Sequence, residues 1–106
     1  MKHLELKTFG VIISTETIGR DIYNLINESI STDNESISTD NEVIIDMDGI
    51  KSMATFCAKQ IFGRLYIELG AEKFYTKISI KNATDDIKTI IQIGIENALE
   101  EHEEKI

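Results

Sequence analysis

Residues 43–69 read VIIDMDGIKSMATFCAKQIFGRLYIEL, and the rest of the chain is arranged around them. The run Val43–Ile45 is β-branched throughout, which predicts a central strand buried on both faces. The polar turn Asp46–Gly49 ends that strand. From Phe56 to Leu69 apolar residues recur at helical spacing, which predicts one long helix that Gly70 terminates. Ligands of parallel α/β sheets collect at the carboxyl ends of strands, so we expect any functional site where this strand passes to this helix.

The composition is that of one acidic domain. The chain has 106 residues, enough for a single modest core, and 42% of them are apolar. Its net charge is −8 with no cluster of Lys and Arg, so we expect no nucleic-acid partner. The only cysteine, Cys57, excludes an internal disulfide and suits a reducing compartment. Because no signal peptide or membrane-length apolar run is visible, we expect a cytoplasmic protein without a membrane partner.

The regions on either side continue an alternation of strands and helices. Residues 3–7 alternate as a short strand, and Val11–Ile13 predicts a second strand that pairs with the first as a hairpin. Ser14–Glu16 offers a hydroxyl N-cap and an acid for the start of a first helix. Gly19 lies inside this helix and indicates close packing there. The apolar stripe of the helix consists of Ile18, Ile22, Leu25, Ile26 and Ile30.

The C-terminal part adds one strand and one helix. Residues 74–81 read FYTKISIK and alternate as a strand, and Thr84 can cap a final helix whose first turn holds Asp85 and Asp86. The sequence therefore predicts an α/β fold with a mixed, mostly parallel sheet of about four strands and with three helices, in the order β-(β)-α-β-α-β-α.

A tandem repeat interrupts the connection from the first helix to the central strand. Residues 28–34 read ESISTDN, and residues 35–41 repeat the same seven letters. One copy would already make a connection of ordinary length, so the second is interpreted as a tolerated insertion, or as a new surface or hinge. The first copy either extends the helix or joins a longer loop. An altered connection also favours domain swapping, which leaves both a monomer and a dimer open.

Several segments together resemble the STAS-like domain family of unknown function. They are Asp46-x-Asp48-Gly49-Ile50, the FGRL piece at residues 62–65, and Gly19-Arg20. Members of that family are small prokaryotic α/β domains related in fold to anti-sigma-factor antagonists, and the resemblance covers nearly the whole chain except the second ESISTDN copy. It implies a non-enzymatic regulatory domain without a cofactor, whose partner is a protein such as a kinase, a sensor or another regulator.

The same resemblance implies a site. STAS domains proper carry Asp-Ser-[Ser/Thr]-Gly in the loop after the central strand, and the Ser or Thr that opens the next helix is phosphorylated. Matching that loop places Ala54 at the Asp position and Thr55 at the phospho-acceptor position. STAS-like members commonly have Ser-Phe-Ala-Asp-Glu here, whereas residues 55–59 read TFCAK, so this chain keeps the hydroxyl and lacks the acids. The candidates for modification or partner contact are Thr55, Ser52, Asp48 and Phe56.

Two further interpretations of this region stay open. A phosphate would be favoured at the start of the second helix, so the loop could bind a small anion or nucleotide, with Arg64 as an anion contact. Alternatively, Ser52 or Thr55 is a plain N-cap and Arg64 a solvated surface residue.

Residues 43–50, VIIDMDGI, also resemble the nucleophile loop of haloacid-dehalogenase-type phosphotransferases. That resemblance implies Asp46 as nucleophile and Asp48 as acid/base, both holding Mg²⁺. The alternative is that both aspartates form a turn at the strand end. His3 and His102 are interpreted as surface residues without a metal site, and Cys57 as a small core residue.

Overall fold

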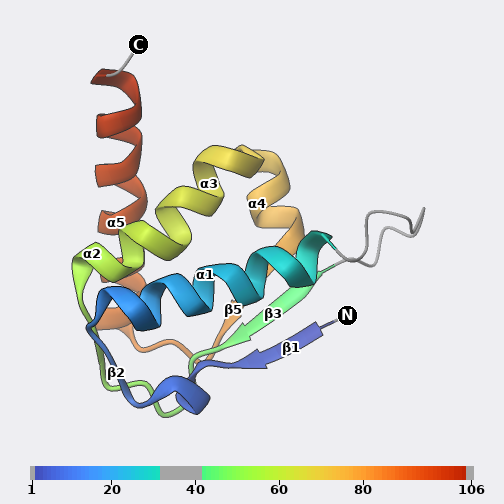
Figure 1. The fold of residues 1–106 in the computed structure, drawn as a ribbon, viewed down its shortest axis with the longest axis vertical. Coiled ribbons are helices and arrows are strands. Elements are labelled where there is room, and N and C mark those ends of the chain that lie inside the picture. Colours follow the sequence, from blue (N-terminus) through green and yellow to red (C-terminus); the bar gives the residue numbers. More distant parts are fainter. Residues whose placement is uncertain (1, 32–41, 105–106) are drawn as a thin grey trace.

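A computed structural model describes residues 2–31 and 42–104 as a parallel sheet packed against helices (Figure 1). Strands β1 (Lys2–Glu5), β3 (Val43–Asp46) and β5 (Ile78–Lys81) pair in the order β1-β3-β5, all parallel. This confirms the predicted mostly parallel α/β fold, with differences in the number and bounds of its elements.

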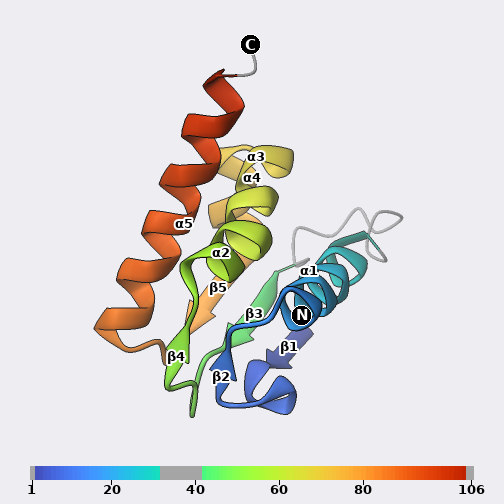
Figure 2. The same ribbon diagram turned by 60° about the vertical axis from the view of Figure 1, so that its left-hand side comes forward.

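The sheet is buried on one face rather than on two. Val43, Ile45 and Ile78 are buried beneath the helices, whereas Ile44 and Ser79 on the opposite face are half-buried and His3 is exposed. Both crossovers step across the sheet in the same direction, and right-handed connections then place their helices on the same side (Figure 2). The prediction that the central strand is covered on both faces is therefore wrong.

A second, two-stranded sheet continues beyond the first. Strand β2 (Ile12–Ile13) pairs in parallel with β4 (Ser52–Met53), Ile12 opposite Ser52. The predicted hairpin between β1 and β2 is wrong, because the 3₁₀ turn η1 (Leu6–Phe9) carries the chain onward instead of back. β4 also separates the Asp46–Gly49 turn from the next helix, so the strand does not pass directly to the helix as the sequence pattern indicated.

Helix α1 (Glu16–Ser31) begins as the sequence predicts. The Thr15 hydroxyl accepts a hydrogen bond from the Ile18 N–H at 3.2 Å. A Cβ atom at Gly19 would overlap Gln60 Oε1 and lie 3.6 Å from Cys57 Sγ, which confirms the expected close packing. The helix includes the first four residues of the first ESISTDN copy, and the remainder of the repeat lies outside the described residues.

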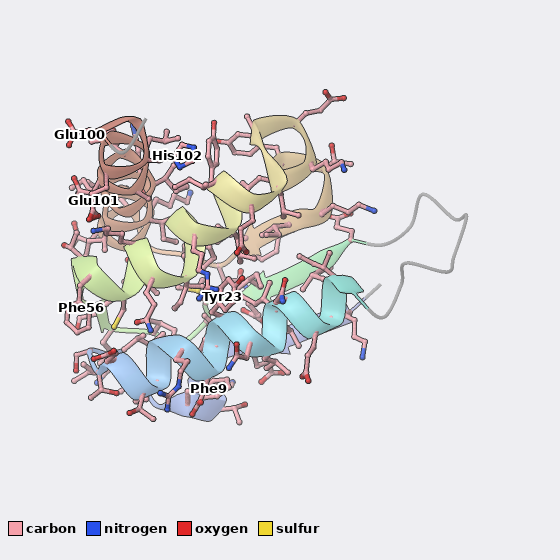
Figure 3. The ribbon with its side chains drawn as sticks, turned by 45° about the horizontal axis from the view of Figure 1, so that its top comes forward. Phe9, Tyr23, Phe56, Glu100, Glu101 and His102 are labelled. Carbon is pink, nitrogen blue, oxygen red and sulfur yellow. The ribbon has the colours of Figure 1, made fainter. Side chains whose placement is uncertain are left out.

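The predicted long helix is a rod of three parts. It consists of α2 (Thr55–Ala58), a π-helical turn η2 (Lys59–Gly63) and α3 (Arg64–Leu69). Gly70, at φ +84°, ends it as expected. The rod lies between α1 and the last helix and carries much of the core (Figure 3).

The segment after the rod departs from prediction. Residues 74–77 belong to helix α4 (Ala71–Lys77), so only the second half of the predicted strand is β5. Phe74 is buried against the Tyr66 ring, with the ring centroids 5.3 Å apart. This contact with the rod overrides the alternating pattern.

Helix α5 (Asp85–Glu104) is capped by Thr84, whose hydroxyl accepts the Ile87 N–H at 3.2 Å as predicted. Small residues bring it against the rod, because a Cβ at Gly94 would lie 2.7 Å from the Ala58 carbonyl carbon. Its last turns extend beyond the other helices (Figure 1). Among the described residues, no helix has both the length and the apolarity to cross a bilayer.

Candidate functional site

Asp46 connects the three strands of the main sheet. Its Oδ2 lies 3.1 Å from His3 Nε2 on β1, and its Oδ1 accepts hydrogen bonds from Asn82 Nδ2 (3.0 Å) after β5 and from the Asp48 N–H (2.9 Å). The bond from Asn82, followed by those from Asp48 and His3, lowers the pKa of Asp46 to about 2. Both carboxylate oxygens are thus used in holding the strand ends together, a role that spacing alone did not indicate.

Asp48 lies on the turn and not at the start of a helix. Its carboxylate is 70% exposed and 3.9 Å from Lys7 Nζ, a loose surface pair. Strand β4 separates the two residues along the chain: Asp48 lies beside Lys7, whereas Thr55 follows Ala54, whose N–H is bonded to Ile13. The structure therefore does not place Asp48 with the other candidates at the start of α2.

The start of α2 has no side-chain cap. Ala54 is the N-cap residue, and its N–H donates to the Ile13 carbonyl at 2.8 Å, which fixes the helix start against β2. The prediction that Ser52 or Thr55 caps this helix is wrong. Thr55 is exposed, and its hydroxyl makes no hydrogen bond within the part of the chain that the structure describes.

Apolar side chains are exposed in the segments that adjoin Thr55 along the chain or across the β2–β4 pair. The apolar spacing predicts that Phe56 belongs to the buried stripe of the rod, but 52% of its surface is exposed. Ile12 is 53% exposed and lies opposite Ser52 in the β2–β4 pair, so these two side chains share one face. We call these exposed residues the junction surface; its members are Val11, Ile12, Ser52, Thr55 and Phe56.

A groove of about 560 Å³ runs along the outer face of the rod. It begins at Phe56 and passes between the N-terminal end of α1 and the C-terminal half of α5 (Figure 3). It is lined by Glu16, Phe56, Lys59, Gln60, Arg64, Ile67, Glu68, Ala98, Glu101 and His102. We call it the three-helix groove. It could not be predicted from the sequence, because its residues come from three separate helices and no motif joins them.

Arg64, the predicted anion contact, is held inside this groove. Its guanidinium lies 4.2 Å from the centre of the Tyr23 ring, and its Nε is 3.4 Å from Glu68 Oε2. The Tyr23 hydroxyl donates to the same Glu68 carboxylate, and burial, followed by this bond, raises the pKa of Tyr23 to about 12. Arg64 therefore already has a carboxylate and an aromatic partner.

Cys57 is a core residue, as expected. It is fully buried, its Sγ donates to the Thr15 carbonyl at 3.4 Å, and burial raises the pKa of the thiol. Within residues 2–31 and 42–104, no group of three or more His, Cys, Asp or Glu side chains is placed to hold a metal ion.

Taken together, the small parallel sheet and its one helical layer define a small α/β domain that is consistent with a STAS-like fold. The family model of the STAS-like domain of unknown function matches residues 18–88, about two thirds of the chain, and the chain belongs to that family. The match runs from α1 into the first turn of α5 and includes the start of α2. No curated protein and no solved structure matches the chain.

Proposed function

We propose that the domain is a non-enzymatic regulatory module that binds a partner protein through the junction surface. The observation that carries this proposal is the exposed Thr55 hydroxyl, which makes no hydrogen bond among the described residues and lies next in sequence to the exposed Phe56 and one residue beyond Ala54, which is bonded to β2. Three of the five strongly exposed large apolar residues in the described chain, Val11, Ile12 and Phe56, belong to this surface. Apolar groups gathered around one polar atom are typical of a protein-binding surface.

Thr55 is the residue that a partner kinase would modify. The resemblance to STAS domains matches it to their phospho-acceptor, and its exposure leaves it accessible to a kinase. A phosphate adds close to two negative charges, and it would do so beside Phe56 on the surface that the partner contacts. Modification would therefore change recognition without unfolding the domain. The partner is then a kinase, a sensor or another regulatory protein.

The hydrogen bonds of Asp46 favour a structural role over that of a phosphotransferase nucleophile. Both of its oxygens accept hydrogen bonds that hold strand ends, whereas a nucleophile needs an oxygen directed at the substrate. An exchange of Asp46 for Asn should therefore alter stability and leave binding at the junction surface intact.

Photo-crosslinking in the source cell tests the proposal. In three separate variants, p-benzoylphenylalanine replaces Ile12, Phe56 or Tyr75. Ile12 and Phe56 belong to the junction surface, and Tyr75 on α4, which is 69% exposed, is the matched control. We expect the same protein to be crosslinked from the two junction positions and not from Tyr75, and the yield to change in a Thr55→Glu background. Equal crosslinking from all three positions, or none from the junction, would contradict the proposal.

A further inference from the structure

The three-helix groove offers a second binding surface, distinct in most of its residues from the junction surface. We propose that it binds a basic amphipathic helix of a partner protein. This inference rests on the proposed function in one respect, that the domain recognises a protein.

The shape of the groove fits a helix better than a compact ligand. Its floor follows the rod from Phe56 to Glu68, and at 1.5 Å per residue these positions lie roughly 18 Å apart. One wall comes from α1, at Glu16, and the other from α5, at Ala98 and Glu101. A trough of this length between two helices can hold about three turns of a third helix, the geometry of helix-in-groove recognition.

The charges of the groove select a basic partner. Lys59 pairs with Glu101, and Arg64 pairs with Glu68, so both cations that line the groove already have carboxylate partners. Glu16 has no such partner among the described residues. The wall formed by α5 is its C-terminal half, where the negative end of the helix dipole adds to its acidic side chains. The lining therefore holds three carboxylates against one Lys and one Arg, and Glu16 is the carboxylate left for a Lys or Arg side chain of a partner.

The same charges argue against a second copy of this chain as the occupant. Each copy carries a net charge of −8, so two copies repel each other. A cationic segment is attracted instead, and its association would weaken as salt screens the charges.

Apolar side chains supply the rest of the recognition surface. Phe56 stands half exposed at one end of the groove, Ile67 is partly buried farther along, and the small side chain of Ala98 leaves room between them. Figure 3 shows Phe56 and Glu101 on the same side of the molecule and His102 on the side of α5 toward α3. Apolar groups along the groove and the unpaired carboxylate of Glu16 complement a helix with one apolar and one basic face.

The test uses the full chain, labelled with ¹⁵N, and a peptide probe of defined chemistry. The probe is an amidated helix of about 16 residues with Leu on one face and Lys on the other, and the reference peptide replaces every Lys with Glu. We expect saturable binding of the basic peptide that weakens with salt, and amide shifts in residues 59–68 and 98–102. No saturable binding at millimolar peptide, equal binding of the acidic peptide, or shifts centred on the open face of the sheet would overturn the proposal.

Charge variants on one helix give the sharpest control. Glu101→Lys places a cation in the groove, and we expect it to weaken the affinity for the basic peptide at least about fivefold. Glu96→Lys makes the same change on the same helix at an exposed position outside the groove, and we expect a loss of less than about twofold. Equal losses would mean non-specific attraction by an acidic surface and would overturn the proposal. Glu101→Gln serves the same comparison if Glu101→Lys unfolds.

An apolar pair separates packing from charge. Ile67→Ala removes an apolar contact from the groove, whereas Ile93→Ala removes an exposed one of similar chemistry from α5 outside it. We expect weaker probe binding only for Ile67→Ala. Neither Glu101 nor Ile67 belongs to the junction surface, so neither variant should affect crosslinking from Ile12. If that crosslinking persists but wild type does not bind the probe peptide, only the proposal for the groove is refuted. Probe binding without any junction crosslink refutes the proposed function alone.

Discussion

At the scale of single residues, the polar side chains of this domain divide into structural and accessible ones. Asp46 uses both oxygens to hold β1, β3 and the chain after β5, and its pKa of about 2 reflects those bonds. Thr55 makes no hydrogen bond among the described residues and faces solvent. Asp46, which lies in the strongest local motif, thus has a structural role, whereas the hydroxyl of Thr55 is available to a partner.

The pKa of Asp46 predicts how stability depends on pH. The folded value of about 2 lies below the ordinary 3.8, so the bonds to ionised Asp46 stabilise the fold fully above about pH 4. This contribution is lost as the pH falls through 2. We expect the difference in urea midpoint between wild type and Asp46→Asn to shrink between pH 5 and pH 2. The control is Asp21→Asn, which changes an exposed carboxylate that takes no part in the hydrogen bonds of Asp46, and no such trend should appear for it. A difference in urea midpoint that stays constant with pH for Asp46→Asn would contradict this account.

Some residue roles could be predicted from sequence and others could not. The caps at Thr15 and Thr84 are local, because the hydroxyl accepts a hydrogen bond from an N–H three residues later. The sequence predicted Thr84 by name and a hydroxyl cap within Ser14–Glu16. The N-cap of α2 is Ala54, whose N–H donates to the Ile13 carbonyl of β2, a strand about 40 residues earlier in the chain. The polar contacts of Asp46 likewise come from residues far along the chain. Only tertiary structure supplies that information.

At the scale of elements, the rod of α2, η2 and α3 organises the helical layer. Its extent was predicted from the apolar spacing, but its π-helical turn was not. That turn coincides with the closest helix contacts, where Cβ atoms at Gly63 and Gly94 would meet α5 and the rod backbone. The strand predicted at residues 74–77 is helical because Phe74 packs on Tyr66. Both departures arise from contacts between elements, which a periodic pattern does not encode.

These contacts predict that Gly94→Ala destabilises the domain. The new Cβ would lie 2.7 Å from backbone atoms of Ala58 and Lys59, so the helices must separate. We expect a loss of about 1–3 kcal/mol in the free energy of unfolding, although Ala favours a helix over Gly by roughly 1 kcal/mol. Urea denaturation followed by circular dichroism measures this. Glu96→Ala at an exposed position of α5 is the control, and a Gly94→Ala variant as stable as wild type would refute the close packing.

At the scale of the whole molecule, one helical layer covers one face of the sheet. The three-helix groove lies on that layer, whereas the junction surface combines residues of β2 and β4 with the start of α2. The fold class was predictable because the alternation of strands and helices favours parallel pairing. The one-sided arrangement was not, because it depends on the direction in which successive strands are added to the sheet. The groove requires three helices from distant parts of the chain, so it too appears only at this scale.

Deletion of one ESISTDN copy should leave the fold intact. Removing either copy gives the same sequence, and residues 16–31, which form α1, are unchanged by removal of the second. Halving or doubling a connection changes loop entropy by only about 0.6 kcal/mol. We expect a shift in Tm of no more than a few degrees and the same elution volume in size-exclusion chromatography. A large loss of stability or a change of oligomeric state would show that the duplicated copy is structural or promotes domain swapping.

The central claim is that Thr55 lies on the surface that binds the partner and that its charge state controls that binding. The most direct measurement is the Kd of the crosslinked partner, purified, for wild type, Thr55→Val and Thr55→Glu. Thr76→Glu on α4, an exposed Thr away from the junction surface, is the control. We predict that Thr55→Glu changes the Kd about tenfold or more while Thr55→Val and Thr76→Glu change it little. Equal affinities for Thr55→Glu and Thr76→Glu would contradict the claim.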